Sequence, residues 1–214
     1  MIRSSTAPVR LGRRSRAIST ALLAGAMIWL DPAPALAHGS LAVGDFYSGM
    51  LHPLLHFETL LPTLALALWS GQLGTPHSWR LPLAFLGAVL VGAAAGILEI
   101  DLQLGPASLR LSMLVLGLLV AVRGKLPVSL AMTMALLFGL FDGQTNTYDP
   151  ETKIERPFLF IAGVGSSIGL LLFHVVTRVV RYRAFWVQTA VRVVGSWIAA
   201  TGLLVLALEW AGGK

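Results

Sequence analysis

Six apolar segments follow one another along the chain, separated by short polar turns, and this recurrence restricts the fold more than any other feature. Their runs are continuous rather than alternating, and an open sheet cannot satisfy its backbone hydrogen bonds in lipid, so we expect helices. With 56% hydrophobic and only 12% charged residues, the chain cannot cover its apolar surface with polar groups. The sequence therefore predicts an all-α polytopic membrane helix bundle with six transmembrane helices. The predicted spans are 42–69, 81–98, 109–122, 127–141, 157–180 and 190–210.

Residues 1–37 have the pattern of a cleavable signal peptide. An arginine-rich start precedes a short apolar run, which ends before the small-residue triplet Ala35-Leu36-Ala37. This run is too short to span the hydrocarbon of a bilayer. Cleavage after Ala37 would make His38 the new amino terminus and leave 38–214 as the transmembrane domain. If cleavage does not occur, the segment becomes an amphipathic tail or an additional anchor.

The charges favour a membrane protein over a nucleic-acid-binding protein. The formal net charge is +6, but the basic residues Arg3, Arg10, Arg13, Arg14 and Arg16 all fall within the predicted signal peptide. No basic patch remains in the rest of the chain, so nucleic acid is excluded as a partner. The chain contains no cysteine, which excludes thiolate zinc sites and iron–sulfur clusters and leaves nitrogen and oxygen ligands for any metal.

Basic and acidic residues alternate between successive turns. Turns 70–80, 123–126 and 178–189 carry arginine and lysine, whereas turns 99–108 and 142–156 are predominantly acidic. Cytoplasmic loops of membrane proteins are enriched in basic residues. We therefore predict a multi-pass protein of the bacterial inner membrane, with both mature termini in the periplasm. The acidic turn 142–156 is either a place that gathers cations or a solvated connector.

Titratable side chains stand inside the first apolar segment, where they are costly in lipid and usually serve a function. They are Asp45, His52, His56 and Glu58. At 100° per residue, Asp45 and the two histidines share one helical face with Thr59 and Thr63, whereas Glu58 falls off that face. Pro53 and Pro62 each remove a backbone hydrogen bond and could break or rotate the helix between them.

This pattern predicts a metal site facing a shared interior channel. His52 and His56 are one turn apart, a spacing at which two imidazoles can bind one divalent ion. Glu58 would complete the site, while Asp45 and Asp142 would lie at its mouth. His38 could chelate a metal through its ring and α-amino group. The alternative is that the two histidines cap broken backbone groups and pack in a core. For His174, we expect an inward-facing ring bonded to a neighbouring carbonyl.

Several stretches resemble the HupE/UreJ family of membrane permeases associated with nickel or cobalt supply to hydrogenase and urease. The first is Gly49-Met-Leu-His52-Pro53-Leu-Leu-His56-Phe-Glu58-Thr59. The family pattern there is His-Pro, four residues, then Asp-His, so only His52 matches outright. Leu137-Phe-Gly139-Leu-Phe-Asp142-Gly143 resembles a second motif, Phe-His-Gly-x-Ala-His-Gly, in which Phe138 and Asp142 stand at the histidine places. The framework glycines are kept while imidazoles are lost.

Two classes of function follow from these observations. One is a secondary permease for a divalent transition metal, which the resemblance indicates to be nickel or cobalt, with copper and zinc as alternatives. The other is a non-transporting membrane subunit or metal-delivery protein, which would act within a homo-oligomer or a metalloenzyme-associated complex. An enzyme is not expected, because no set of acid, base and nucleophile can be assembled. Small residues in 87–96 and 163–169 predict close helix packing.

Overall fold

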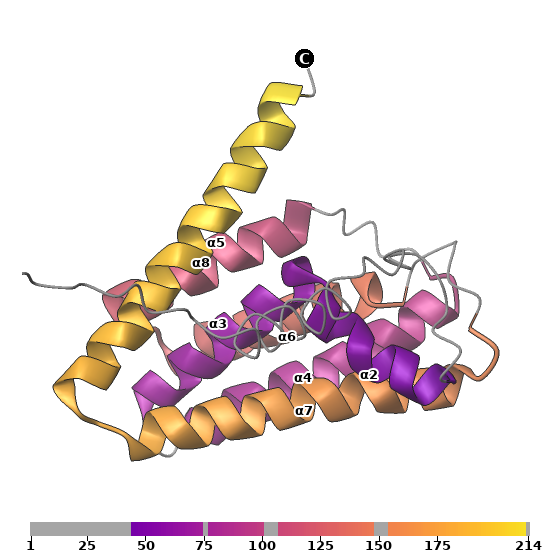
Figure 1. The fold of residues 1–214 in the computed structure, drawn as a ribbon, viewed down its shortest axis with the longest axis horizontal. Coiled ribbons are helices and arrows are strands. Elements are labelled where there is room, and N and C mark those ends of the chain that lie inside the picture. The colour runs from indigo at the N-terminus through magenta and orange to yellow at the C-terminus, as the bar shows by residue number, and fades with distance from the viewer. Residues whose placement is uncertain (1–43, 75–76, 101–106, 148–153, 213–214) are drawn as a thin grey trace, which may run out of the picture. The chain divides into compact units, whose positions relative to one another are not determined.

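The computed structural model describes residues 44–74, 77–100, 107–147 and 154–212, all within the compact unit Ser40–Lys214. These residues form helices and connecting turns, with no strand among them (Figure 1). The all-α class is therefore confirmed for the described residues. The predicted signal segment and His38 lie outside them. The helices are α2 (Asp45–Leu55), α3 (Phe57–Leu73), α4 (His77–Ile97), α5 (Ala107–Val122), α6 (Val128–Thr145), α7 (Pro157–Arg181) and α8 (Phe185–Gly212).

Four of the described helices, α4, α6, α7 and α8, are long and apolar enough to cross a membrane. Helices α2 and α3 pass the same test together, but they meet at a bend of 74°. The predicted first span 42–69 is therefore a broken span or a re-entrant loop, with a break between Pro53 and Pro62 as their missing hydrogen bonds predicted. Helix α5 is apolar but has only 16 residues. The structure thus supports up to five spans, and the predicted number of six is not confirmed.

Two predicted turns differ from the structure. Helix α6 continues to Thr145, so the predicted exported turn 142–156 begins inside a helix, and its first residues are buried rather than solvated. Helix α4 begins at His77, within the turn predicted for 70–80. Both segments are too polar to be recognised as part of a span from hydropathy alone.

Glycine allows α4 and α6 to pack with their backbones in direct contact. A Cβ at Gly139 would lie 2.6 Å from the carbonyl oxygen of Phe85, and one at Gly143 would collide with the carbonyl oxygen of Val89. Gly49 and Gly163 bring α2 and α7 together in the same way. The predicted close packing of 87–96 and 163–169 is confirmed at Gly92, Gly96 and Gly163. Small residues are a common means of helix association in membranes.

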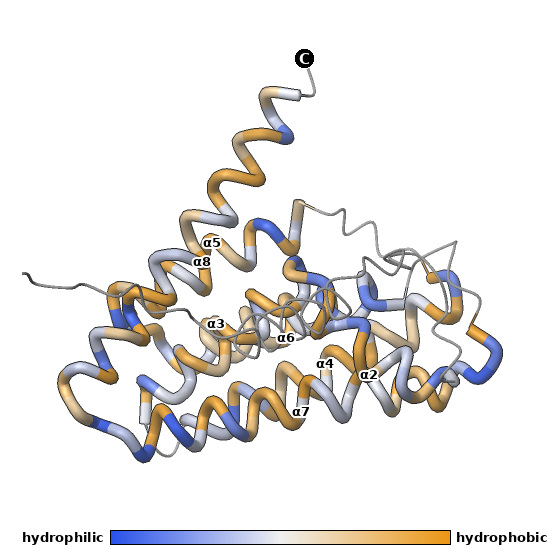
Figure 2. The backbone as a smooth tube through the Cα atoms, viewed as in Figure 1, coloured by the Kyte–Doolittle hydropathy of each residue, from blue (hydrophilic) through white to orange (hydrophobic). Residues whose placement is uncertain are grey.

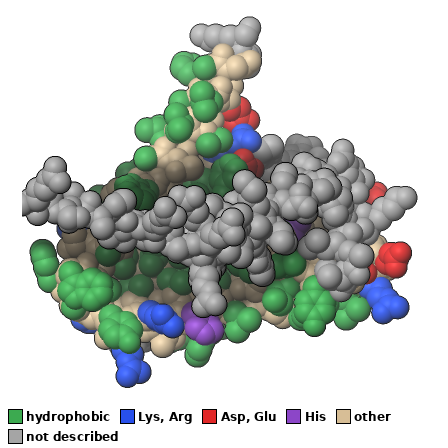
Figure 3. Space-filling model, in the orientation of Figure 1, with side chains coloured by type: hydrophobic (Ala, Val, Ile, Leu, Met, Phe, Trp, Pro, Cys, Tyr) green, Lys and Arg blue, Asp and Glu red, His purple; other side chains and the backbone are tan. Residues whose placement is uncertain are grey.

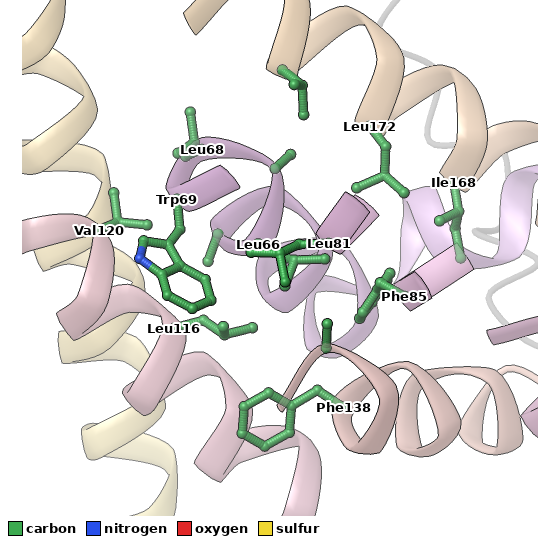
Figure 4. Close-up of a cluster of buried hydrophobic side chains, with 14 of the residues drawn as sticks. Leu66, Leu68, Trp69, Leu81, Phe85, Leu116, Val120, Phe138, Ile168 and Leu172 are labelled. Atoms are coloured by element: carbon green, nitrogen blue, oxygen red, sulfur yellow. The ribbon is translucent and has the colours of Figure 1, made fainter. Parts of the chain in front are cut away.

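The centre of the bundle is apolar. Leu66, Trp69, Phe85 and Leu116 are fully buried, and Figure 4 shows them close together with Phe138 around α3. Trp69, at the end of the predicted span 42–69, belongs to this core rather than to an aromatic belt at the membrane surface. Its indole Nε1 donates a hydrogen bond of 2.8 Å to the carbonyl of Gly124. The interior around the second half of α3 is therefore filled by side chains.

Apolar side chains also cover the outside of the bundle. On the face drawn in Figure 3, they occupy much of the flank between patches of charged side chains. Exposed leucine, valine or phenylalanine side chains occur on every described helix. On α3 they are limited to Phe57, in the first turn. Helix α8 packs against α5 through Gly195 and Gly202. These surfaces are suited to contact with lipid hydrocarbon.

The bundle has a basic end and an acidic end. At the basic end, Arg192 Nε donates to the carbonyl of Ala121, and Gly71 lies against Val179, which brings the predicted basic turns together. Every described basic residue except Arg110 and Arg156 lies there. Hydrophilic residues gather near the helix ends in Figure 2.

Candidate metal centre at the break between α2 and α3

His56 is the residue at which the first span breaks. It lies between the two helices with an extended backbone, φ −97° and ψ 108°. Its N–H still donates to the carbonyl of His52 at 3.2 Å. The Thr59 hydroxyl lies 3.2 Å from the carbonyl oxygen of Pro53 and 3.0 Å from that of His56. Because Thr59 is buried and has a single hydroxyl proton, it satisfies one or the other carbonyl and ties the two helices together.

The two imidazoles of the predicted site lie in contact. The ring centroids of His52 and His56 are 4.1 Å apart, and their planes differ by 23°, so the rings are stacked. His56 Nδ1 lies 2.8 Å from the carbonyl oxygen of His52. A carbonyl only accepts hydrogen bonds, so Nδ1 carries the proton, and the Nε2 of neutral His56 keeps its lone pair for a metal. His52 is half-buried beside Phe160, whereas His56 is exposed.

Stacked rings do not point their nitrogens at one common ion. One imidazole must turn about its side-chain bonds before both can bind the same metal. His56 is the side chain with room to do this, because it is exposed. The bend also divides the predicted polar face, since His56 is exposed while Thr59 and Thr63 are buried in α3. The prediction of one continuous polar face toward an interior channel is therefore wrong.

Glu58 is engaged by a cation that the sequence reasoning missed. Its Oε1 lies 3.5 Å from Arg110 Nε, and Arg110 also forms an ion pair with Glu209. This network joins α3, α5 and α8. Within the parts of the chain that the structure describes, no group of three or more histidine and acidic side chains is placed to hold a metal ion. His52, His56 and Glu58 therefore do not form a complete ligand set in this conformation.

Asp45 and Asp142 are not placed as an open mouth. Asp45 Oδ2 accepts a hydrogen bond of 2.6 Å from the backbone N–H of Arg156 and so joins α2 to the start of α7. Asp142 is fully buried, which contradicts its expected place at the entrance. Its Oδ2 lies 3.3 Å from Asn146 Nδ2, while its Oδ1 has no hydrogen-bond partner.

Buried oxygen atoms gather at the C-terminal end of α6, a feature that was not predicted. Asp142, Gln144, Asn146 and Thr147 are all buried. Gln144 Nε2 donates to the carbonyl of Ile100 at 3.0 Å, and the Thr147 hydroxyl donates to that of Ala93 at 3.1 Å, so their donors fix α6 to α4. Asp142 Oδ1, Gln144 Oε1 and Asn146 Oδ1 are buried without a hydrogen-bond partner. The run of polar residues 144–147 is visible in the sequence, but its composition is that of an exposed turn.

His174 lies apart from the predicted site. Its Nδ1 is 2.8 Å from the carbonyl oxygen of Leu170, which confirms the expected bond to a neighbouring carbonyl. The ring is exposed rather than inward-facing. His56 and His174 thus make the same local hydrogen bond, one at a helix break and the other inside an uninterrupted helix.

The apolar helices, their glycine contacts and the broken span are the features of a multi-pass membrane protein. The profile of the HupE / UreJ protein family matches residues 26–205. The chain belongs to the HupE/UreJ family, a membrane transport or accessory family that is generally associated with nickel and cobalt transport and is not a known enzyme family. It is similar to Protein HupE of Rhizobium leguminosarum bv. viciae, with 27% identity over 189 residues, 88% of this chain and 96% of that protein. No solved structure matches the chain.

Proposed function

We propose that this chain is a secondary permease of the bacterial inner membrane that moves a divalent transition-metal cation, nickel or cobalt. The observation that carries the proposal is the imidazole pair at the break between α2 and α3. Two histidines one turn apart supply nitrogen ligands suited to these metals. Their place at a 74° bend in an apolar helix pair is typical of the discontinuous helices that bind ions in transporters.

In this proposal, the metal binds first to His52 and His56 after the exposed His56 ring turns away from its stacked position. Glu58 joins them when its contact with Arg110, with 3.5 Å between Oε1 and Nε, opens. Asp45 and a mature amino-terminal His38 guide the ion from the periplasmic side. This direction of entry assumes that both mature termini lie in the periplasm, an orientation that the distribution of basic turns favours.

Asp142 is the second proposed binding position along the route. Its buried Oδ1 and the neighbouring Asn146 Oδ1 are oxygen ligands without partners. Oxygen ligands are harder than imidazole, so this position would hold the cation more weakly than a histidine at the same place in the motif. Weak successive sites are a requirement for conduction, because an ion must leave as well as enter.

The second candidate function is a non-transporting subunit or metal-delivery protein, and two observations favour it. Glu58 is paired with Arg110 rather than with the histidines. Fully buried Leu66 and Trp69 fill the interior beyond Thr63, which leaves a metal no evident polar route through α3. Under this alternative, the histidine pair hands metal to a partner in a metalloenzyme-associated complex or in a second copy of the chain.

Metal accumulation by cells that express the full chain tests the proposal. We expect uptake of nickel or cobalt by the wild type, a loss of about tenfold or more in His52→Ala and His56→Ala, and no change in His174→Ala. The control is matched because His174 makes the same backbone hydrogen bond as His56. Uptake that is equal in all four proteins contradicts a histidine site. Absence of uptake together with stable co-purification of a partner supports the subunit.

A further inference from the structure

A cavity of about 260 Å³ opens at the basic end of the bundle, far along α3 from the histidine pair. It lies between the end of α3, the start of α4 and the turn that leads into α6. Two cationic side chains, Arg80 and Lys125, line it together with apolar residues that include Leu73, Leu81 and Met132. The cavity therefore combines positive charge with hydrocarbon walls.

The walls of this cavity are held in place by the surrounding structure. Leu81 and Ala131 are almost fully buried, at 2% and 3% exposure. Trp69 Nε1 donates to the carbonyl of Gly124, beside Lys125, and Gln72 Nε2 donates to the carbonyl of Val120 at 3.2 Å. These bonds fix the turn between α5 and α6 against α3. A preformed cavity loses little conformational entropy when a ligand binds.

The two cations of the cavity are not neutralised by neighbouring acids. Among the described residues, both ion pairs involve Arg110, and neither Arg80 nor Lys125 forms one. The described acidic residues belong to the first turns of α2 and α3, the end of α4, the end of α6, the start of α7 and the end of α8. Arg80 and Lys125 therefore present positive charge that an anionic ligand would complement.

We propose that this cavity binds the headgroup of an anionic phospholipid. Arg80 and Lys125 hold the phosphate, and the first methylene groups of the acyl chains lie against Leu73, Leu81 and Met132. A free phosphate would use the two cations but not the apolar walls, whereas an amphiphile uses both. Basic pockets between membrane helices are a known class of anionic headgroup site. The inference is independent of metal transport, because no proposed metal ligand lines the cavity.

Native mass spectrometry of the full chain released from detergent micelles tests this site. Phosphatidylglycerol, phosphatidylcholine and inorganic phosphate are added separately, and the bound fraction is measured against concentration. We expect phosphatidylglycerol to bind most tightly, and Arg80→Gln combined with Lys125→Gln to weaken its binding about tenfold or more, because two charge-assisted hydrogen bonds are lost. The control combines Arg178→Gln with Arg181→Gln, which removes the same charge from the same end of the bundle but outside the cavity.

A second variant guards against a folding defect in the first. Val128 lines the cavity and is 47% exposed, so Val128→Asp introduces a repelling carboxylate at a position where folding should tolerate it. We expect the same loss of phosphatidylglycerol binding. The proposal is overturned if phosphatidylglycerol and phosphatidylcholine bind equally, if the cavity variants bind as the control does, or if inorganic phosphate binds as tightly as phosphatidylglycerol.

Discussion

The junction of α2 with α3 and the contact of α4 with α6 show two ways in which this chain uses small and helix-breaking residues. At the junction, Pro53 and an extended His56 interrupt the helix, and one buried hydroxyl, that of Thr59, reaches both sides. Between α4 and α6, Gly139 and Gly143 let two uninterrupted helices meet backbone to backbone. The first region is an interrupted helix joined by a side chain, whereas the second is held by direct backbone contact.

The difference explains where titratable groups are placed. His56 and Glu58, which the proposed metal site would require to change partners, are exposed or half-buried at the junction. Asp142, one residue before the packed Gly143, is fully buried.

The largest expected effect comes from breaking the glycine contact. In Gly143→Ala, the added methyl group would collide with the backbone of Val89, which cannot give way as a flexible side chain would. We expect a loss of about 3 kcal/mol or more in the free energy of unfolding, measured by thermal or denaturant unfolding in detergent. The control is Gly87→Ala, where nothing lies within 4 Å of the added Cβ. Equal stability of the two variants would show that α4 and α6 are not closely packed.

Removing Arg110 tests how firmly the junction is attached to α5 and α8. Arg110→Met leaves Glu58 and Glu209 without their shared cation. We expect the free energy of unfolding to fall by about 1–3 kcal/mol. Glu209→Gln should cost less, about 0.5 kcal/mol, because that carboxylate is nearly half exposed. Unfolding of both single variants and the double variant gives the coupling energy of the pair. A coupling of zero would mean that the ion pair does not stabilise the fold.

Thr59→Val sharpens the comparison at the break itself. The substitution keeps the shape of the side chain but removes the hydroxyl that contacts Pro53 and His56. We expect the free energy of unfolding to fall by about 1 kcal/mol. Relative to the wild type, amide exchange should become faster in 54–60 but not in α4. The matched control is Thr201→Val, because the Thr201 hydroxyl also bonds a carbonyl but is not part of a break. If both variants exchange alike, Thr59 does not hold the two helices together.

Asp142→Asn should have the smallest effect on stability. A buried carboxylate with an unpartnered oxygen is unfavourable, so its replacement by an amide of the same size should leave the free energy of unfolding within about 1 kcal/mol of the wild type or raise it. Metal accumulation, measured in the same cells, should nevertheless fall if Asp142 binds the cation. Unchanged accumulation would remove Asp142 from the proposed route while leaving the histidine pair untouched.

The sequence alone predicted the all-α class, the family and the break in the first span. Hydrophobic segments and prolines act locally, through desolvation and a missing N–H, so they can be recognised without knowing what lies opposite. The same locality explains the correct prediction of a carbonyl bond for His174, which requires only the preceding turn of its own helix.

Which groups each of these side chains contacts was decided by the tertiary structure. The pairing of Glu58 with Arg110, the burial of Asp142 and Trp69, and the gathering of Gln144, Asn146 and Thr147 between α4 and α6 all depend on helices far apart in the sequence. From the sequence alone, Glu58 was predicted in a metal site, Asp142 at its entrance and 144–147 in a turn. A side chain's free energy depends on the groups that surround it, and only the packing of helices sets those groups.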